Sequence, residues 1–386
     1  MQARAVVVKR DERGHRVYEL RESFDCPPLE EHNIAVKIKA CGLSVHDAKI
    51  LEEFNLISKK EQPSGREISG IVTNVGSAVT RVSIGDEVAG ILPLDSAAAG
   101  CANFCVMSEY DVARKPEKVD HIDAAGCIGD VVKAYTALHY QGRVCSGETV
   151  LILNGASVSK ESYQMSLVPS HQVGLLNREV CCLHNKASGV MQIQLAHIWG
   201  AKVLATASSE EEVIYLQSLQ QSIANVVDLR STKKSLLDIC MDETGGLGVD
   251  CVIDNGGLHQ DDFVREQGDL SAPNVKTSSP SKHDVISCLA VAGRWITCLH
   301  DLQLDPPDSQ LLYLKGASVS FLFEHSWILS RGQQGRYLHI LNDIMEKLST
   351  SVIRPVIHHT VSLEDACDTL QHQFSNHKVG KIVVRM

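Results

Sequence analysis

The chain has 386 residues, of which 44% are hydrophobic and 22% charged, so it can form buried cores and is not a disordered protein. Lys and Arg total 37 against 47 Asp and Glu, and the formal net charge of −10 argues against nucleic-acid binding through a broad basic surface. No apolar run approaches the roughly 20 residues of a membrane span, and residues 1–10 lack the apolar core of a signal peptide.

Short β-branched runs separated by turns characterise the first 125 residues. These runs are Ala5–Val8, Ile34–Ile38, Gly70–Val75 and Asp86–Ile91. Residues of this kind favour strands, and in the second run the alternation of Val36 and Lys37 is typical of a strand with one buried face. We therefore predict a β-rich first domain.

Longer units begin near residue 126, where Asp130–Tyr140 has the pattern of a helix. Apolar strands then alternate with helical stretches, and the predicted strands are Thr149–Leu153, Lys202–Ala207, Asp250–Asp254 and Arg294–Cys298. Strands buried on both faces with helices between them predict an α/β domain with a doubly wound parallel sheet. Ser209 and Glu212 predict a capping box at the start of one of its helices.

Strand patterns return near the end of the chain. Ile353–Ile357 and Lys381–Arg385 flank a predicted helix, Leu363–Phe374. We expect this part to close back on the first domain, which is then discontinuous. The predicted domains are residues 1–125 with 300–386, and residues 126–299.

The strand Thr149–Leu153 runs into a candidate phosphate-binding loop. In dinucleotide-binding folds, backbone N–H groups and a helix N-terminus at this turn bind the pyrophosphate. Here residues 158–186 separate the turn from its helix, so we expect the loop to be disrupted. The predicted cofactor-binding residues of this loop are Gly155, Ala156, Ser157, Ser188 and Gly189.

Residues 158–186 show no helix or strand period, and a structureless loop of this length is unusual inside a domain. Val158-Ser159-Lys160 is what a read-through splice donor would encode, which favours a retained intron, a rare isoform or a gene-model artefact. An evolved insertion is the competing interpretation. Asp261–Asp284 is polar and predicts a solvated loop, with an active-site lid as the alternative.

The type of nucleotide is read from the end of the strand Lys202–Ala207. NAD sites usually have Asp or Glu there to bind the ribose 2′-hydroxyl. This strand ends in Ser208 without an acid, which favours NADPH and makes Ser208 a candidate binding residue. No Arg follows to bind a 2′-phosphate, and a simple turn at Ser208 is the alternative.

Candidate metal ligands lie in small, separate groups. They are Cys181-Cys182 with His184, Cys101 with Cys105, and His358-His359. A closed zinc site needs four ligands, so each group is interpreted as structural or solvated. The 13 scattered cysteines predict reduced thiols in a cytoplasmic protein. Asp254-Asn-Gly-Gly257 follows a buried strand where ligands bind in such folds, and a glycine turn is its other interpretation.

Seven motifs share one order along the chain. They are Ala40–Asp47, Gly65–Val72, Gly85–Val88, Ala134–Leu138, Gly155–Ser157, Gly245–Asp250 and Gly380–Val383. With them the chain resembles the zinc-independent quinone oxidoreductases of the medium-chain dehydrogenase/reductase superfamily, the zeta-crystallin group. The resemblance implies a GroES-like β-rich catalytic domain joined to a Rossmann-type domain, and an NADPH-dependent reductase of quinones or conjugated carbonyls.

The resemblance also bears on zinc. Where zinc alcohol dehydrogenases of the superfamily have a Cys and a His ligand, this chain has Ser44 and Arg66. A guanidinium has no lone pair to offer a metal, so no zinc is expected. Quinone reductases of the family carry Asn-Pro in place of Ser44-Val45, and the catalytic residues are left unassigned.

A second function follows from the same resemblance. A vertebrate member of this group belongs to an endosome-associated assembly, the FERRY complex. The alternative is therefore a catalytically inactive reductase fold that acts as an interaction subunit, cytoplasmic and peripheral on early endosomes, without direct nucleic-acid contact. Ser318–Phe321 is an expected edge strand through which the family suggests a homo-oligomer.

Overall fold

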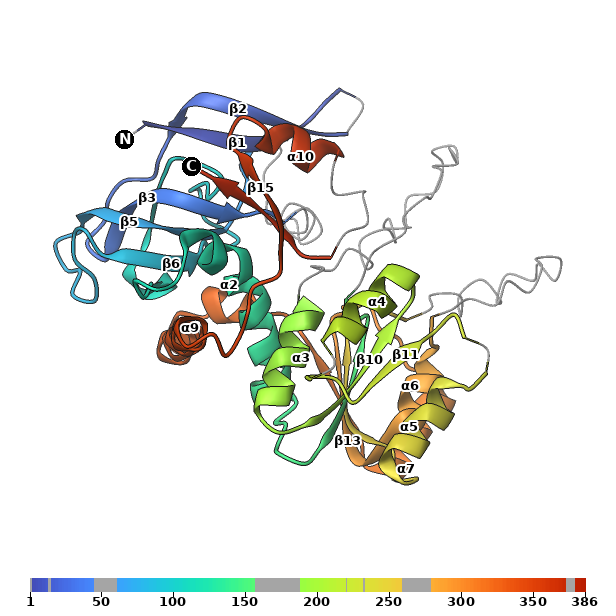
Figure 1. Ribbon diagram of the computed structural model, residues 1–386. Helices are drawn as coiled ribbons and strands as arrows, with labels where there is room; N and C mark the ends of the chain where they lie inside the picture. The colour runs from blue at the N-terminus through green and yellow to red at the C-terminus, as the bar shows by residue number, and fades with distance from the viewer. Residues whose placement is uncertain are drawn as a thin grey trace. The chain divides into compact units, whose positions relative to one another are not determined.

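A computed structural model describes residues 2–12, 15–44, 61–156, 188–219, 221–231, 233–258, 279–372 and 379–386. These residues form two compact units (Figure 1). The first, called the β-rich unit, comprises Met1–Val132 and Glu324–Met386 within the described ranges. The second, called the parallel-sheet unit, comprises the described residues between Lys133 and Phe323. The inserted segment 158–186 and residues 261–278 of the predicted lid lie outside the described residues.

The β-rich unit contains mostly short strands. Its strands are β1 (Gln2–Arg10), β2 (Arg16–Asp25), β3 (Asn33–Gly42), β4 (Gln62–Pro63), β5 (Glu67–Val75), β6 (Glu87–Ile91), β7 (Phe104–Ser108), β8 (Val112–Arg114), β15 (Ile357–Ser362) and β16 (Lys381–Arg385). Its helices are η1 (Glu109–Asp111), α2 (His121–Tyr135), α8 (Ser326–Leu329), η6 (Arg331–Gln333), α9 (Gln334–Ser349) and α10 (Ala366–His372). The boundary between the units falls within α2.

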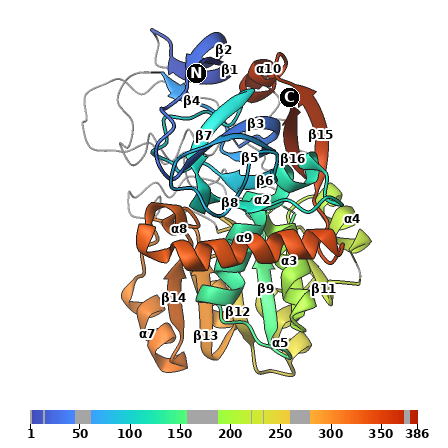
Figure 2. The same ribbon diagram turned by 90° about the vertical axis from the view of Figure 1, so that its left-hand side faces the viewer.

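Two sheets organise this unit (Figure 2). The larger has the order β15-β16-β3-β5-β6-β8, with β7 also paired to β3, and the smaller has the order β2-β1-β4. Apolar side chains such as Ile34, Ile38 and Ile68 fill the core between the strands. The predicted β-rich fold is confirmed, and β16 joins the sheet by antiparallel pairing with β3.

Twelve elements form the parallel-sheet unit within its described residues. The strands are β9 (Thr149–Leu153), β10 (Lys202–Ala207), β11 (Asn225–Asp228), β12 (Val249–Asp254), β13 (Leu289–Thr297) and β14 (Ser318–Phe321). The helices are η2 (Thr136–Gln141), α3 (Ser188–Ile198), α4 (Glu210–Ser218), α5 (Leu236–Thr244), α6 (Lys282–Cys288) and α7 (Pro306–Lys315).

The strands of this unit are parallel, in the order β11-β10-β9-β12-β13-β14 (Figure 2). Figure 1 shows α3 and α4 on one face of the sheet and α5, α6 and α7 on the other. Every residue of β9 is buried, as an apolar strand covered on both faces should be. Trp295 of β13 is fully buried in the core. The predicted doubly wound sheet is confirmed.

Three details of the prediction are corrected. Residues 300–323, predicted to lie in the β-rich domain, belong to the parallel-sheet unit, because β14 pairs with β13. The strand predicted at Ile353–Ile357 lies further along the chain, since β15 starts at Ile357, where pairing with β16 begins. The helix predicted at Asp130–Tyr140 starts earlier, at His121, and becomes a π-helix at Thr136.

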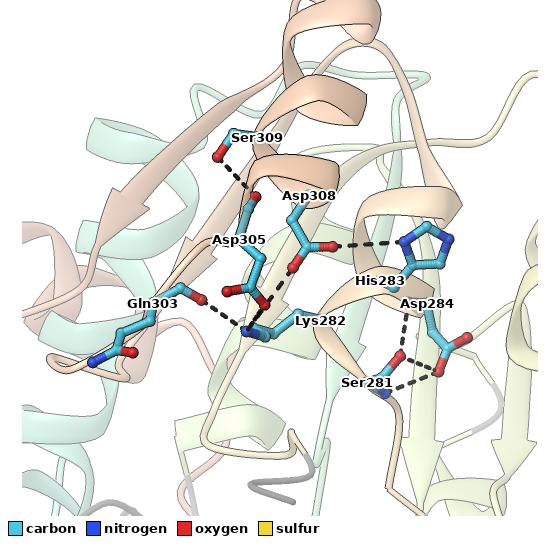
Figure 3. Close-up of polar contacts among 8 residues, drawn as sticks. All are labelled: Ser281, Lys282, His283, Asp284, Gln303, Asp305, Asp308 and Ser309. Carbon is cyan, nitrogen blue, oxygen red and sulfur yellow. Dashed lines mark hydrogen bonds and ion pairs between the residues drawn. The ribbon is translucent and has the colours of Figure 1, made fainter. Parts of the chain in front are cut away.

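Helices α6 and α7 are linked by a small polar cluster at their N-termini (Figure 3). The Nζ of Lys282 lies 3.4 Å from Oδ2 of Asp305 and 3.9 Å from Oδ2 of Asp308. Nδ1 of His283 lies 3.6 Å from the other oxygen of Asp308. Ser281 caps α6 through a reciprocal capping box. These contacts fix the relative position of two helices on one face of the sheet.

Asp111 makes the stability of the β-rich unit depend on pH. Burial and the nearby Asp95 raise the pKa of Asp111 to about 7, although Arg331 opposes them. Since an unfolded Asp has a pKa near 4, this residue makes the native state less stable as the pH rises from about 4 to about 7. We expect Asp111→Asn to raise the free energy of unfolding by about 1–3 kcal/mol at pH 8 and by less at pH 5. Urea unfolding at both pH values measures the difference, and an equal effect at both would contradict it.

Among the described residues, no helix combines the length and apolar character needed to cross a bilayer.

Candidate functional site

The candidate site lies at one edge of the parallel sheet. Strands β9, β10, β12 and β13 end there at Leu153, Ala207, Asp254 and Thr297. Because the strands are parallel, their carboxyl ends share this edge, which is where open α/β sheets bind ligands. The residues that follow the strands therefore define the chemistry of the site.

The turn after β9 is closely packed against α3. The N–H of Asn154 donates to Oγ1 of Thr206 at 2.9 Å, and the N–H of Gly155 donates to the carbonyl of Thr206 at 3.2 Å. A Cβ on Gly189 would lie only 2.5 Å from the carbonyl oxygen of Gly155. Only glycine at position 189 permits this approach, which sets the start of α3 beside the end of β9.

Four predicted loop residues are thus brought together: Gly155, Ala156, Ser188 and Gly189. Ala156 and Ser188 are both buried. Ser157 lies outside the described residues, so its role stays a prediction. A strand end, small residues and a helix N-terminus in this arrangement fit the pyrophosphate of a dinucleotide.

Asp254 holds the turn that follows β12. Its Oδ1 accepts from the N–H of Gly256 at 2.9 Å and of Gly257 at 2.8 Å, and its Oδ2 accepts from Oγ1 of Thr297 at 2.8 Å. Burial raises the pKa of Asp254, against the opposing effect of these hydrogen bonds. The fully buried carboxylate of Asp254 therefore supports the glycine turn, which is the second of the two interpretations of this motif.

A buried amide pair, which the sequence patterns did not reveal, links this turn to α3. Nε2 of Gln192 donates to Oδ1 of Asn255 at 3.0 Å, and Nδ2 of Asn255 donates to Oε1 of Gln192 at 2.7 Å. Asn255 also donates to the carbonyl of Leu153 at 3.3 Å. The pair ties α3 to the ends of β9 and β12, so it stiffens the edge where a nucleotide would lie.

An acid does lie at the end of β10, contrary to the sequence interpretation. Ser208 follows β10, and Oε2 of Glu212 accepts from its N–H at 2.6 Å and from its Oγ at 3.0 Å. Ser209 is the N-cap of α4 and accepts from the N–H of Glu212, as predicted. The carboxylate, however, reaches past the cap to Ser208. The spacing of Ser209 and Glu212 was recognised in the sequence, but it predicted that the Glu212 carboxylate would bond to Ser209 and not to Ser208.

The β-rich unit has its own buried charge cluster. Nζ of Lys381 lies 2.6 Å from both carboxylate oxygens of Glu67 and 3.0 Å from Oδ2 of Asp130. Burial alone would lower the pKa of Lys381, but Asp130 and Glu67 outweigh it and raise that pKa. Glu67 and Lys381 belong to two of the ordered motifs, yet nothing local in the sequence links them.

Ser44 and Arg66, which the resemblance matches to zinc ligands of zinc alcohol dehydrogenases, flank strands of the β-rich unit. Ser44 follows β3, and Arg66, which is buried, precedes β5 and donates to the carbonyl of Pro93. An arginine engaged in this way does not fit a metal-binding role.

The other predicted metal ligands do not assemble either. Cys101 and Cys105 are buried free thiols, and burial raises the pKa of Cys105 well above its usual value. His358 and His359 lie inside β15, although the predicted strand Ile353–Ile357 ends before them. Within the described ranges, no three His, Cys, Asp or Glu side chains group as metal ligands. Cys181, Cys182 and His184 lie outside those ranges, and the absence of zinc stays a prediction.

Comparison with known proteins agrees with this architecture. The Alcohol dehydrogenase GroES-like domain family matches residues 30–142, and the Zinc-binding dehydrogenase family matches residues 223–384. The chain is 42% identical over 365 residues to quinone oxidoreductase-like protein 1 of Mus musculus, covering 95% of this chain and 94% of that protein. It is 26% identical over 235 residues to the chloroplastic NADPH-dependent alkenal/one oxidoreductase of Arabidopsis thaliana, covering 58% of this chain and 52% of that protein.

Among solved structures, an alcohol dehydrogenase superfamily protein from Novosphingobium aromaticivorans superposes with a TM-score of 0.75 at 21% identity. The match covers 100% of this chain and 100% of that chain, so the two proteins share a fold. The resemblance to the family is confirmed by the extended similarity to the mouse protein. The chain belongs to the quinone oxidoreductase-like proteins of the medium-chain dehydrogenase/reductase superfamily.

Proposed function

We propose that this protein is a zinc-independent oxidoreductase that uses a reduced nicotinamide nucleotide to reduce quinones or similar conjugated carbonyls. The observation that carries the proposal is the close approach of Gly189 to Gly155, which places the α3 N-terminus beside the end of β9. The 42% identity to a quinone oxidoreductase-like protein supports the substrate class. The likeness to an alkenal/one oxidoreductase supports conjugated carbonyls as further acceptors.

The nucleotide supplies the hydride, so the protein mainly has to bind and orient it. Backbone N–H groups at the start of α3 would face the pyrophosphate, and the absence of a side chain at Gly155 and Gly189 lets β9 and α3 pack closely enough to place them there. The Asp254 turn and the Gln192–Asn255 pair hold the neighbouring strand ends rigid. Transfer to a quinone needs a positioned nicotinamide more than an acid–base side chain, and we assign no catalytic residue.

The test is a titration of NADPH and NADH, followed by nicotinamide fluorescence, on the full chain and on a variant that joins Ser157 to Ala187. NADPH is the nucleotide predicted from the sequence, and NADH is included because Glu212 lies at the end of β10. We expect the variant to bind at least about tenfold more tightly, because its chain passes directly from β9 into α3. Reduction of a model quinone, read from nicotinamide absorbance, should accompany binding.

Failure of both proteins to bind either nucleotide would contradict the reductase. It would favour the alternative, an inactive fold that serves as an interaction subunit of an endosome-associated, FERRY-type assembly. That role, the early-endosomal location and the homo-oligomer stay predictions.

A further inference from the structure

Ser208 directly follows β10, at the edge of the sheet where a nucleotide would bind. It is partly exposed, whereas Glu212 behind it is fully buried. In doubly wound folds the second strand of the nucleotide-binding unit ends beside the adenosine ribose, and a residue at that end distinguishes a 2′-hydroxyl from a 2′-phosphate. In this chain β10 has that place, because it follows β9 and α3 and pairs with β9.

The hydrogen bonds of Ser208 limit what it can bind. Ser208 has two hydrogen-bond donors, and both donate to Oε2 of Glu212: the backbone N–H at 2.6 Å and the hydroxyl at 3.0 Å. Phosphate oxygens only accept hydrogen bonds, so Ser208 has no donor left for a 2′-phosphate. The lone pairs of its hydroxyl oxygen remain, and a ribose 2′-hydroxyl can donate to them.

The charges around Ser208 act in the same direction. Glu210 and Glu211 lie in the first turn of α4 with Glu212, and all three are acidic. The cation nearby, Arg230, is bound by Asp228 at 2.9 Å and 3.0 Å, and its Nη1 is 3.9 Å from Glu210. The hydrogen bonds and charge of Asp228, and less strongly the charges of Glu210 and Glu211, raise the pKa of Arg230, so its charge is already matched by acids. A 2′-phosphate with nearly two negative charges would be repelled here.

We propose that Glu212, acting through Ser208, selects a nucleotide with a free 2′-hydroxyl, so that this protein binds NADH more tightly than NADPH. The proposal rests on the proposed function and reverses the preference that the sequence suggested. Its physical basis is that Glu212 is buried and doubly hydrogen-bonded, so it cannot move aside to relieve the repulsion.

Calorimetric titration with half-nucleotides isolates this end of the cofactor. The probes are 5′-ADP and 2′,5′-ADP, followed by NADH and NADPH, on the full chain and on the variant lacking residues 158–186. We expect 5′-ADP and NADH to bind about tenfold or more tightly than their 2′-phosphorylated counterparts. Glu212→Gln, which removes the charge and keeps the shape, should reduce this ratio at least about fivefold.

Glu211→Gln is the matched control, because Glu211 is in the same helical turn but exposed. It should change the ratio less than about twofold, since an exposed charge is screened by solvent. Ser208→Ala is a second, independent variant, which leaves the buried carboxylate in place. It should weaken 5′-ADP and leave 2′,5′-ADP unchanged, and it carries the test if Glu212→Gln does not fold, as judged by thermal unfolding.

The outcomes separate the two proposals. Tighter or equal binding of the 2′-phosphorylated probes by the wild-type chain would overturn the selectivity and leave the reductase intact. A ratio that neither Glu212→Gln nor Ser208→Ala changes would do the same. If no probe binds with or without residues 158–186, both the selectivity and the proposed function are wrong.

Discussion

Replacing Lys381 with Met is expected to lower the free energy of unfolding by about 3–5 kcal/mol at pH 7. The side chain of Lys381 is fully buried, and its ammonium group faces the carboxylates of Glu67 and Asp130. Without it, two buried acids must share the β-rich core with no cation between them, and each must take up a proton or remain charged. Urea unfolding of wild type and variant measures the loss.

Two further variants make this prediction specific. Lys234→Met removes one member of an exposed ion pair, with Asp242, and should change the free energy of unfolding far less, because solvent screens this pair. Adding Glu67→Gln and Asp130→Asn to Lys381→Met should restore more than half of the loss, because the neutral amides no longer need a cation. A loss below about 1 kcal/mol for Lys381→Met would contradict the charge-pairing argument.

Asp254→Ala should lower the free energy of unfolding by about 3–5 kcal/mol. The substitution leaves the N–H groups of Gly256 and Gly257 and the hydroxyl of Thr297 without their shared acceptor in a buried place. Each buried donor left unsatisfied costs about 1–3 kcal/mol. Because the turn holds Asn255 against α3, the affinity for the nucleotide should fall as well.

Asp254→Asn is the control for this substitution. Its side-chain oxygen can still accept from both glycines, and it removes a charge whose burial raises the pKa of Asp254. We expect it to stay within about 1 kcal/mol of wild type, and its relative stability to improve as the pH rises, because a raised acid pKa makes the ionised native state less favourable. Equal losses for the Ala and Asn variants would show that the hydrogen bonds of Oδ1 do not hold the turn.

Local patterns were sufficient for most of the fold. The apolar runs in β9, β10 and β12 are long enough, and far enough apart, to identify a parallel sheet before any contact is known. The prediction failed where the position of a strand depends on which other strand it pairs with. Ile353–Ile357 is β-branched, yet the strand forms on the less apolar stretch from Ile357 to Ser362 because that stretch lies beside β16. Likewise Ser318–Phe321 was expected as an edge strand, as β14 is, but its own residues do not show that it pairs with β13 in the parallel sheet.

The candidate site was only partly visible in the sequence. Gly155 and Gly189 were found because small residues after a strand are typical of nucleotide loops. Lys381 and Glu67 are 314 positions apart, and the Gln192–Asn255 pair is separated by 63, so no local spacing indicates either contact. The carboxylate of Glu212 was missed for a different reason: its side chain passes the N-cap by one residue, a choice that helix periodicity does not determine.

The place of β16 in its sheet has a consequence for biosynthesis. Strand β16 pairs with β3 on one side and with β15 on the other. The larger sheet of the β-rich unit is therefore completed by a strand that is synthesised after the whole parallel-sheet unit. During translation the parallel-sheet unit can fold as soon as β14 has emerged. At that stage the residues Ala40–Gly42 of β3 still lack their partner in β16, whereas Asn33–Lys37 can already pair with β7. Termination of the chain shortly before Lys381 should therefore leave this end of β3 unpaired and yield a product more prone to aggregate than the full chain.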